Sequence, residues 1–284
     1  MKTNGRRQFL VRFGYDGSRF HGLQPQGTLP TAGATLRARI EAAALQRARA
    51  LSFAARTDAG VHALQNAATF WLGNPLDVAD FLATLQQSRD DGLWLVRGEE
   101  VPLHIHARGS SRGKRYRYRI EYGVNEGEDG SRYEWSIVPP LDVAAMREAA
   151  QSLVGTHDFS SFRAPRCSSS TPVKTVAGVR VSEQVRTPRG SWVVLVDIVG
   201  DAFLRKMVRI VVGTLAEVGV GLRAPSEMAG VLAARNRAAA GIAAPARGLT
   251  LMQVGLAWPE DGSALVRELS HDVAQRSTPA PLRG

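Results

Sequence analysis

Residues 201–219 read DAFLRKMVRIVVGTLAEVG, and this segment restricts the fold of the chain more than any other. Written on a helix, its middle is apolar nearly all round, at Met207, Val208, Ile210, Val211, Val212 and Leu215. A helix of this kind is buried, so other elements must cover it. Arg209 shares a stripe with Val212 and Ala216, and a buried cation without a partner costs about 3–5 kcal/mol. We therefore expect Arg209 either to pair with an acid or to reach the surface along its stem.

The rest of the chain alternates between strand and helix patterns, separated by turn-rich stretches such as TPRGS at 187–191. Strands are expected at 9–16, near Leu51, and at 67–72, 93–97, 115–120, 173–185, 192–199 and 249–256. Helices are expected at 35–49, 77–87, 141–153, 203–218 and 226–235. Adjacent hairpins with separate helices indicate an α+β fold in which helices cover one face of a sheet.

The composition favours a globular protein that meets a polyanion. The chain has 284 residues, 44% of them hydrophobic, which is enough for one large domain or two of ordinary size. No apolar run approaches the roughly 20 residues of a membrane helix, so we expect a soluble, cytoplasmic protein. The single cysteine, Cys167, excludes an intramolecular disulfide. The net charge of +10 favours a partner rich in phosphates, whose counterions basic side chains would release.

The basic side chains are concentrated in residues 108–119, RGSSRGKRYRYR, which contain no acid. In an extended strand, Tyr116, Tyr118 and Ile120 would face one way. The intervening side chains, Arg115, Arg117 and Arg119, would face the other. Rings that stack on bases and arginines that pair with phosphates are typical of nucleic-acid binding. The alternative is an ordinary strand with its tyrosines in the core and its arginines in solvent.

A second polar cluster lies in residues 54–64, AARTDAGVHAL, where Asp58 stands between Arg56 and His62. The small residues around it permit a tight turn and close approach of a ligand. One interpretation is therefore a functional site. The other is a surface turn in which Thr57 and Asp58 bond to the nearby backbone.

Other constellations favour no further chemistry. His104 and His106 alternate along a strand, but no acidic or thiol ligand stands at a recognised metal-site spacing, so no metal is expected. Asp16 and Asp158 stand where an acid commonly makes a turn or a helix cap. A phosphate-binding glycine loop with its lysine does not occur, which argues against a nucleoside triphosphatase.

Taken in order, the segments ARTDAGVHA, HARGSSRGKRYRY and FLRKMVRIVVG resemble the TruA-type tRNA pseudouridine synthase family. The opening YDGSRFHGLQPQ (15–26), the segment DFSSFRA (158–164) and the closing GLTLMQVGL (248–256) are similar to the family as well. The resemblance covers most of residues 9–257. Ala55 replaces the usual Gly of the first motif, Leu23 replaces a Trp, and Ile210 replaces the Asn that usually follows MVR.

The resemblance implies a role for each matching residue. Asp58 would be the catalytic aspartate, Arg56 would help to displace the target base, and Tyr116 would stack on the uracil. Arg209 would pair with the aspartate, and Leu251 would form an apolar wall of the base pocket. Basic residues would contact the RNA backbone, and those expected to do so are Arg108, Arg112, Lys114, Arg115, Arg205 and Lys206.

The family's architecture implies an α+β fold of two α/β halves that share a mostly antiparallel sheet, with helices on the outer faces and the active-site cleft between the halves. We place the N-terminal half at 1–105, the C-terminal half at 106–259 and a loose tail at 260–284. The implied activity is isomerisation of uridines 38–40 in tRNA anticodon arms by a homodimer, without a metal or an organic cofactor. The alternative is an RNA-binding or tRNA-folding factor on the same scaffold without turnover.

Overall fold

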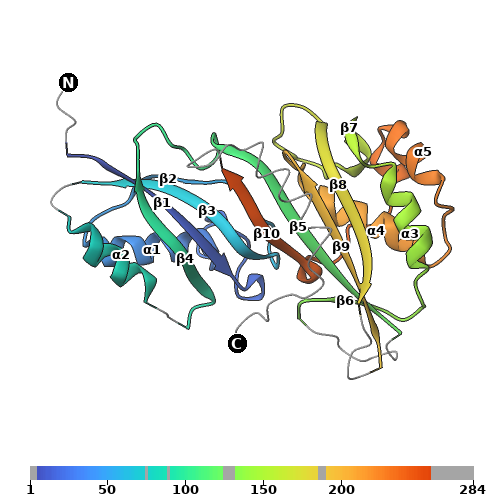
Figure 1. Ribbon diagram of the computed structural model, residues 1–284, viewed down its shortest axis with the longest axis horizontal. Coiled ribbons are helices and arrows are strands. Elements are labelled where there is room, and N and C mark those ends of the chain that lie inside the picture. Colours follow the sequence, from blue (N-terminus) through green and yellow to red (C-terminus); the bar gives the residue numbers. More distant parts are fainter. Residues whose placement is uncertain (1–4, 74–75, 88–89, 124–131, 185–189, 257–284) are drawn as a thin grey trace. The chain divides into compact units, whose positions relative to one another are not determined.

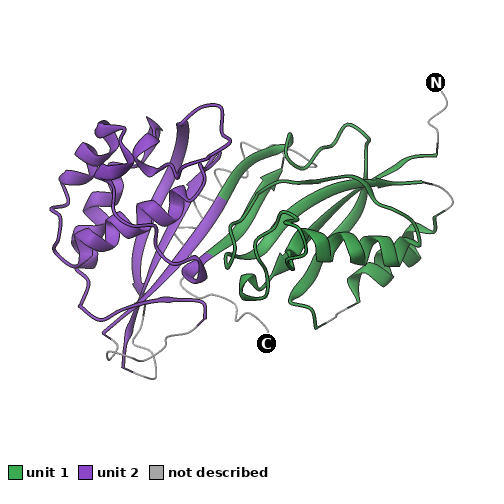
Figure 2. Cartoon of the chain, turned by 180° about the vertical axis from the view of Figure 1, so that it is seen from behind, with its two compact units in different colours: residues 1–114, 250–262 green, residues 115–249, 263–284 purple. Residues whose placement is uncertain are grey.

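The computed structural model describes residues 5–73, 76–87, 90–123, 132–184 and 190–256 (Figure 1). The chain divides into two compact units, residues 1–114 with 250–262 and residues 115–249 with 263–284 (Figure 2). The division differs from the expected boundary at 105/106, and it returns the strand from Thr250 onward to the first unit. The expected turn at 187–189 and the tail from 260 lie outside the described residues.

The sheet of the first unit is built from β1 (Arg7–Tyr15), β2 (Arg49–Phe53), β3 (His62–Leu72), β4 (Leu93–Val101) and β10 (Leu249–Leu256). Its strand order is β4-β1-β3-β10, and β2 also pairs with β3. All pairs are antiparallel except β10 with β3, which aligns Thr250 with His62 and Leu251 with Ala63. This parallel pairing explains why the last strand belongs to the first unit.

Two helices, α1 (Ala32–Ala44) and α2 (Val78–Gln86), cover one face of this sheet (Figure 1). Phe81 of α2 is buried edge-on against Phe9, with ring centroids 5.2 Å apart. The α1 helix begins before the expected residue 35 because the Thr31 hydroxyl caps it, accepting from the Ala34 amide at 3.3 Å. It ends before the expected residue 49 because Leu45 is left-handed, with φ 51°.

The second unit contains β5 (Ser111–Tyr122), which begins in the first unit, β6 (Trp135–Ile137), β7 (Gly155–Asp158), β8 (Val173–Gln184) and β9 (Trp192–Gly200). The strand order is β5-β9-β8-β7, with β6 parallel to β5 and with antiparallel pairing of β8 to both β7 and β9. The sequence did not anticipate β6 and β7, which have only 3 and 4 residues.

Three helices, α3 (Val143–Gln151), α4 (Met207–Gly219) and α5 (Glu227–Ala234), lie on one face of the second sheet (Figure 1). The prediction that the central apolar helix is buried is confirmed, since only Arg209 and Glu217 of α4 keep substantial exposure. It starts at Met207 and not at 203 because Lys206 is left-handed, with φ 59°. The α+β class is confirmed, and none of the described helices has the length and apolar composition of a membrane span.

Candidate active site

The Asp58 loop, residues 54–61, joins β2 to β3, and hydrogen bonds hold its main chain near both ends. The buried side chain of Asn66 donates to the Ala55 carbonyl at 2.9 Å and accepts from the Ala55 amide at 3.3 Å. A turn at the other end of the loop is closed by the Val61 amide, which donates to the Asp58 carbonyl at 3.2 Å. With the backbone fixed in this way, the side chain of Asp58 is partly exposed and that of Arg56 is exposed.

The buried side chain of Tyr15 supports the Asp58 loop. The Tyr15 hydroxyl lies 2.7 Å from Oγ1 of Thr57, the residue before Asp58. Burial raises the pKa of Tyr15 to about 12, so the phenol stays neutral at ordinary pH. The Thr57 carbonyl also accepts from the Leu23 amide at 3.3 Å. Strand β1 and the segment that follows it therefore fix the residue next to Asp58 on both its main chain and its side chain.

Two glycines of the opening YDGSRFHG segment form a seat for the Asp58 loop. A Cβ added to Gly17 would lie 2.3 Å from the Val61 carbonyl oxygen, which no real contact permits. At Gly22, whose φ is +86°, an added Cβ would lie 2.9 Å from the Thr57 carbonyl oxygen. Both glycines thus let two backbone segments meet at a distance that any side chain would prevent.

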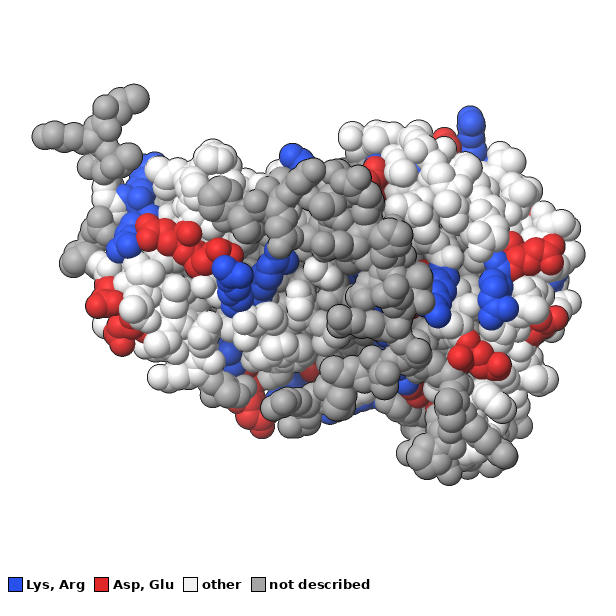
Figure 3. All heavy atoms as spheres, viewed as in Figure 1, with Lys and Arg blue, Asp and Glu red and all other residues white. Residues whose placement is uncertain are grey.

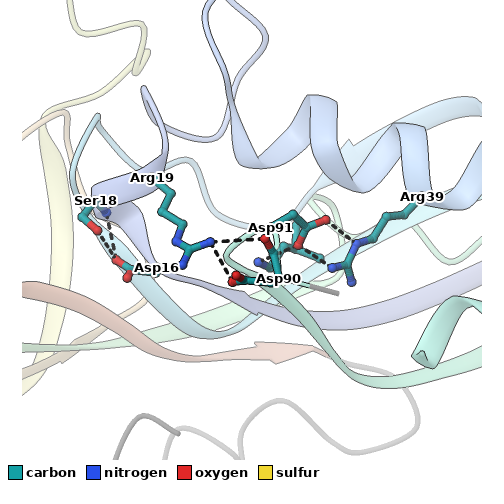
Figure 4. Close-up of polar contacts among 7 residues, drawn as sticks. Asp16, Ser18, Arg19, Arg39, Asp90 and Asp91 are labelled. Carbon is teal, nitrogen blue, oxygen red and sulfur yellow. Dashed lines mark hydrogen bonds and ion pairs between the residues drawn. The ribbon is translucent and has the colours of Figure 1, made fainter. Parts of the chain in front are cut away.

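The 3-10 turn η1 (Gly17–Arg19), which carries Gly17, is itself braced (Figure 4). Asp16 caps it by accepting from the Ser18 amide at 3.0 Å, as the sequence predicted for this acid. Arg19 donates to the Asp90 carboxylate at 2.9 Å, and Asp91 pairs with the buried Arg39 of α1. These contacts connect the seat of the Asp58 loop to α1 and to the start of β4.

His62, the last polar residue of the motif, is structural and almost fully buried, with 1% of its surface exposed. Its Nδ1 accepts from the Gly17 amide at 3.0 Å and lies 3.2 Å from Oδ1 of Asp16. Among the described residues, no group of three or more His, Cys, Asp or Glu side chains could hold a metal ion. His62 therefore acts as one more tie between η1 and the strand that leaves the Asp58 loop.

Leu251 lies in β10, which pairs with β3, the strand that leaves the Asp58 loop. Its side chain is fully buried, and its Cα partner is Ala63, which follows the loop by two residues. The parallel pairing of β10 with β3 thus brings Leu251 close in the fold to the end of the Asp58 loop, although the two are far apart in sequence.

In the second unit, Tyr116 of β5 is 6% exposed and packs edge-on against Phe203, with ring centroids 5.3 Å apart and an interplanar angle of 89°. Phe203 precedes α4, which carries Arg209. This contact between the two rings connects the predicted stacking residue to the segment that leads into α4.

Arg209 is partly exposed and is clasped by the main chain of Ala244. Its Nε donates to the Ala244 carbonyl at 2.7 Å, and the Ala244 amide donates to the Arg209 carbonyl at 3.0 Å. The contact requires close packing of α4, where a Cβ added to Gly213 would lie 1.9 Å from the Ile242 carbonyl oxygen. The position of Arg209 is therefore fixed within its own unit, and its pairing with Asp58 stays a prediction.

The expectation that the arginines of β5 face solvent or phosphate is wrong for Arg115 and Arg117. Each is 6% exposed and pairs with the buried carboxylate of Asp197, at 3.2 Å and 2.9 Å. Arg119 pairs with Glu134. Arg115 and Arg117 both reach the neighbouring strand of the sheet, β9, and the acid of β9 that neutralises them was missed. Its signal in the sequence was a lone acid within the apolar stretch VVLVDIVG.

The remaining expected RNA contacts are accessible. Arg108, Arg112 and Arg205 are exposed, and Lys114 and Lys206 are partly exposed. Nη1 of Arg112 donates to the Gly109 carbonyl at 3.1 Å, and Nη1 of Arg205 donates to the Pro165 carbonyl at 3.2 Å. Figure 3 shows that on one face the basic side chains occur in small groups, several of them beside acids. Arg7, for example, forms an ion pair with Glu100 at 2.7 Å.

The three departures from the family pattern all lie in the core. Ala55, Leu23 and Ile210 are 3%, 0% and 1% exposed. Their side chains therefore serve packing around the Asp58 loop and α4, and none of them presents a polar group to the surface.

Comparison with known proteins agrees with the motifs. Residues 149–255 match the family model described as tRNA pseudouridine synthase. The tRNA pseudouridine synthase A of Geotalea uraniireducens is 36% identical over 251 residues, which cover 87% of this chain and 99% of that protein. The protein of the same name from Syntrophotalea carbinolica is 42% identical over 206 residues, covering 72% of this chain and 79% of that protein. With this similarity extending over nearly the whole length of a relative, the chain belongs to the tRNA pseudouridine synthase A family.

Proposed function

We propose that this protein is a tRNA pseudouridine synthase that isomerises uridines in the anticodon stem-loop. The observation that carries the proposal is the 36% identity that spans 99% of a relative named for this activity. The Asp58 loop supports it, because an acid on a fixed backbone with a partly exposed side chain suits an active site. A factor that only binds RNA would gain nothing from an anion that faces phosphates.

The chemistry fits the residues. Uridine and pseudouridine are isomers, so the N1–C1′ bond must break, the uracil must turn, and C5 must bond to C1′. C5 then loses its proton, and N1 gains one. An ionised carboxylate can serve as a nucleophile or as a base, and Asp58 supplies it. An adjacent guanidinium keeps a carboxylate ionised, which is the role we assign to Arg209.

The other side chains would handle the base and the backbone. We assign Arg56 to the RNA beside the displaced base, Tyr116 to stacking on the uracil, and Leu251 to the apolar wall of the base pocket. The exposed or partly exposed cations are assigned to phosphates, and they are Arg108, Arg112, Lys114, Arg205 and Lys206. Arg115 is removed from this group because its guanidinium is buried on Asp197.

We propose uridines 38–40 as the targets and a homodimer in the cytoplasm as the acting form. Light scattering of the purified protein at several concentrations tests the dimer. A chain that remains monomeric and fully active would contradict it.

The function is tested by mapping pseudouridine in tRNA incubated with the purified protein. The Asp58→Asn variant should produce none while binding tRNA within a few-fold of the wild type, because phosphate contacts hold the RNA. The matched control is Asp77→Asn, which removes an exposed carboxylate but keeps a good cap on α2. Modification by Asp58→Asn, or none by the wild type, would refute the proposal.

A further inference from the structure

The two arginines that flank Tyr116 in β5 converge on one carboxylate. Nε of Arg115 donates to Oδ1 of Asp197 at 3.2 Å. Arg117 donates to both oxygens of the same group, with Nε 3.0 Å from Oδ1 and Nη2 2.9 Å from Oδ2. Because side chains alternate along a strand, Tyr116 faces the opposite side of β5 from both arginines. A single acid on β9 therefore holds the residues immediately before and after the predicted stacking ring.

This cluster is buried, which makes its geometry restrictive. Asp197 is 2% exposed, and each arginine is 6% exposed. A buried charge is tolerated only when it is paired and hydrogen-bonded, so a shift of β5 that separates these groups is strongly disfavoured. A slip of one residue would turn Tyr116 to the wrong face of the sheet. The pairing with Asp197 therefore fixes the register of β5 and the side of the sheet to which the Tyr116 ring points.

The contact on the opposite face of β5 shows why a fixed position of this strand matters for Tyr116. The Tyr116 ring packs edge-on against Phe203, at 5.3 Å between centroids, in the segment that leads into α4 and Arg209. A small rotation of β5 would move the ring away from this contact.

We propose that Asp197 is a positioning residue, which acts through Arg115 and Arg117 to hold Tyr116 where it stacks on the target base. The proposal rests on the proposed function and adds to it a residue that touches neither the RNA nor the reacting atoms. It also assigns Arg115 and Arg117 to positioning and not to phosphate binding.

The test measures single-turnover rate and KM for tRNA in Asp197→Asn, in Tyr116→Leu and in the double variant. Asp197→Asn should lower the rate constant at saturating tRNA by about tenfold or more while KM stays within about twofold. In the Tyr116→Leu background the same change should have little further effect, because the ring that Asp197 positions is gone. Additive losses in the cycle, or a change confined to KM, would overturn the proposal.

Arg117→Lys provides a milder variant in case Asp197→Asn does not fold. Lysine keeps the charge but cannot form the two parallel bonds that Arg117 makes to Asp197, so the rate should fall by about threefold. The salt dependence of tRNA binding should not change, whereas a lost phosphate contact would lower the log–log slope by about 0.7–0.9. A lower slope with an unchanged rate would assign Arg117 to RNA.

Two controls separate positioning from general stability. Asp142→Ala removes the hydrogen bond that caps α3 in the same unit, and it should lower the unfolding midpoint without changing the rate of folded enzyme. Arg180→Lys alters an arginine whose Cα partner on the neighbouring strand is Asp197, but among the described contacts its side chain forms no hydrogen bond or ion pair with the Asp197 side chain, and it should leave the rate unchanged. An active wild type with an equally active Asp197→Asn would refute this inference alone, whereas an inactive wild type would refute the proposed function.

Discussion

Replacement of Gly17 by Ala isolates the steric role of the seat beneath the Asp58 loop. The φ of Gly17 is not in the left-handed region, so alanine brings no backbone strain, and the effect comes from its methyl group alone. That group would lie 2.3 Å from the Val61 carbonyl oxygen, and real contacts essentially never fall under 3.0 Å. Turn η1 and the loop must therefore separate by about 0.7 Å or more, the difference between these two distances.

The displacement should affect stability and rate differently. Overpacking of this kind reduces the free energy of unfolding by about 1–3 kcal/mol. Because Val61 closes the turn that begins at Asp58, the carboxylate moves with it, and a misplacement near 1 Å can lower a rate by about 100-fold. Affinity for tRNA should stay within a few-fold, because phosphate contacts lie elsewhere.

Urea unfolding, tRNA binding and single-turnover pseudouridine formation measure the three effects on Gly17→Ala. The matched control is Gly178→Ala in β8, where an added Cβ meets nothing within 4 Å and φ is not left-handed. The control should keep the wild-type rate. If Gly17→Ala also keeps it, the seat does not position Asp58 and the reasoning is wrong.

Three other predictions test separate contacts. Tyr15→Phe should lower the free energy of unfolding by about 1 kcal/mol through loss of the bond to Thr57. Burial raises the pKa of Tyr15 from 10.0 to about 12 in the folded protein. The contribution of the neutral phenol to the free energy of unfolding is therefore complete below pH 10 and is lost as the pH rises toward 12. The free energy of unfolding of Tyr15→Phe should lack this alkaline decline. Lys206→Gly should stabilise the chain by about 1 kcal/mol because it relieves a left-handed residue, yet it should weaken tRNA binding and reduce its salt dependence. Arg209→Leu and Asp58→Asn should be non-additive in unfolding, with a coupling of about 0.5–3 kcal/mol, whereas additivity would mean that Arg209 does not pair with Asp58.

Local sequence determined most elements of this fold. The burial of α4 follows from apolar side chains around its whole circumference, and the start of α2 follows from Asp77, which caps it through the Asp80 amide at 3.0 Å. These features depend on residues a few positions apart, so periodicity and caps reveal them. The short strands β6 and β7 were not predicted, because 3 or 4 residues are too few to show the alternation of side chains that indicates a strand.

The motif resemblance also located the candidate site residues, but it said little about what holds them. Gly17 and Gly22 belong to the YDGSRFHG segment, which by itself is a weak indicator of the family. Their role depends on contacts with the backbone of the Asp58 loop, at Val61 and Thr57, which only the folded chain brings together. Nothing local in YDGS indicates that a carbonyl oxygen from residue 61 will occupy the space of a side chain.

Only the tertiary structure decided what the arginines of β5 do. Their alternation with tyrosines predicts a strand, and that strand is present, but alternation cannot say which face is covered. The neighbouring strand β9 brings Asp197 from 80 residues beyond Arg117, and this acid makes burial of two cations possible. The environment of a charge depends on groups that fold against it from a distance, so the same pattern that indicated RNA contacts at Arg115 and Arg117 describes a buried ion cluster.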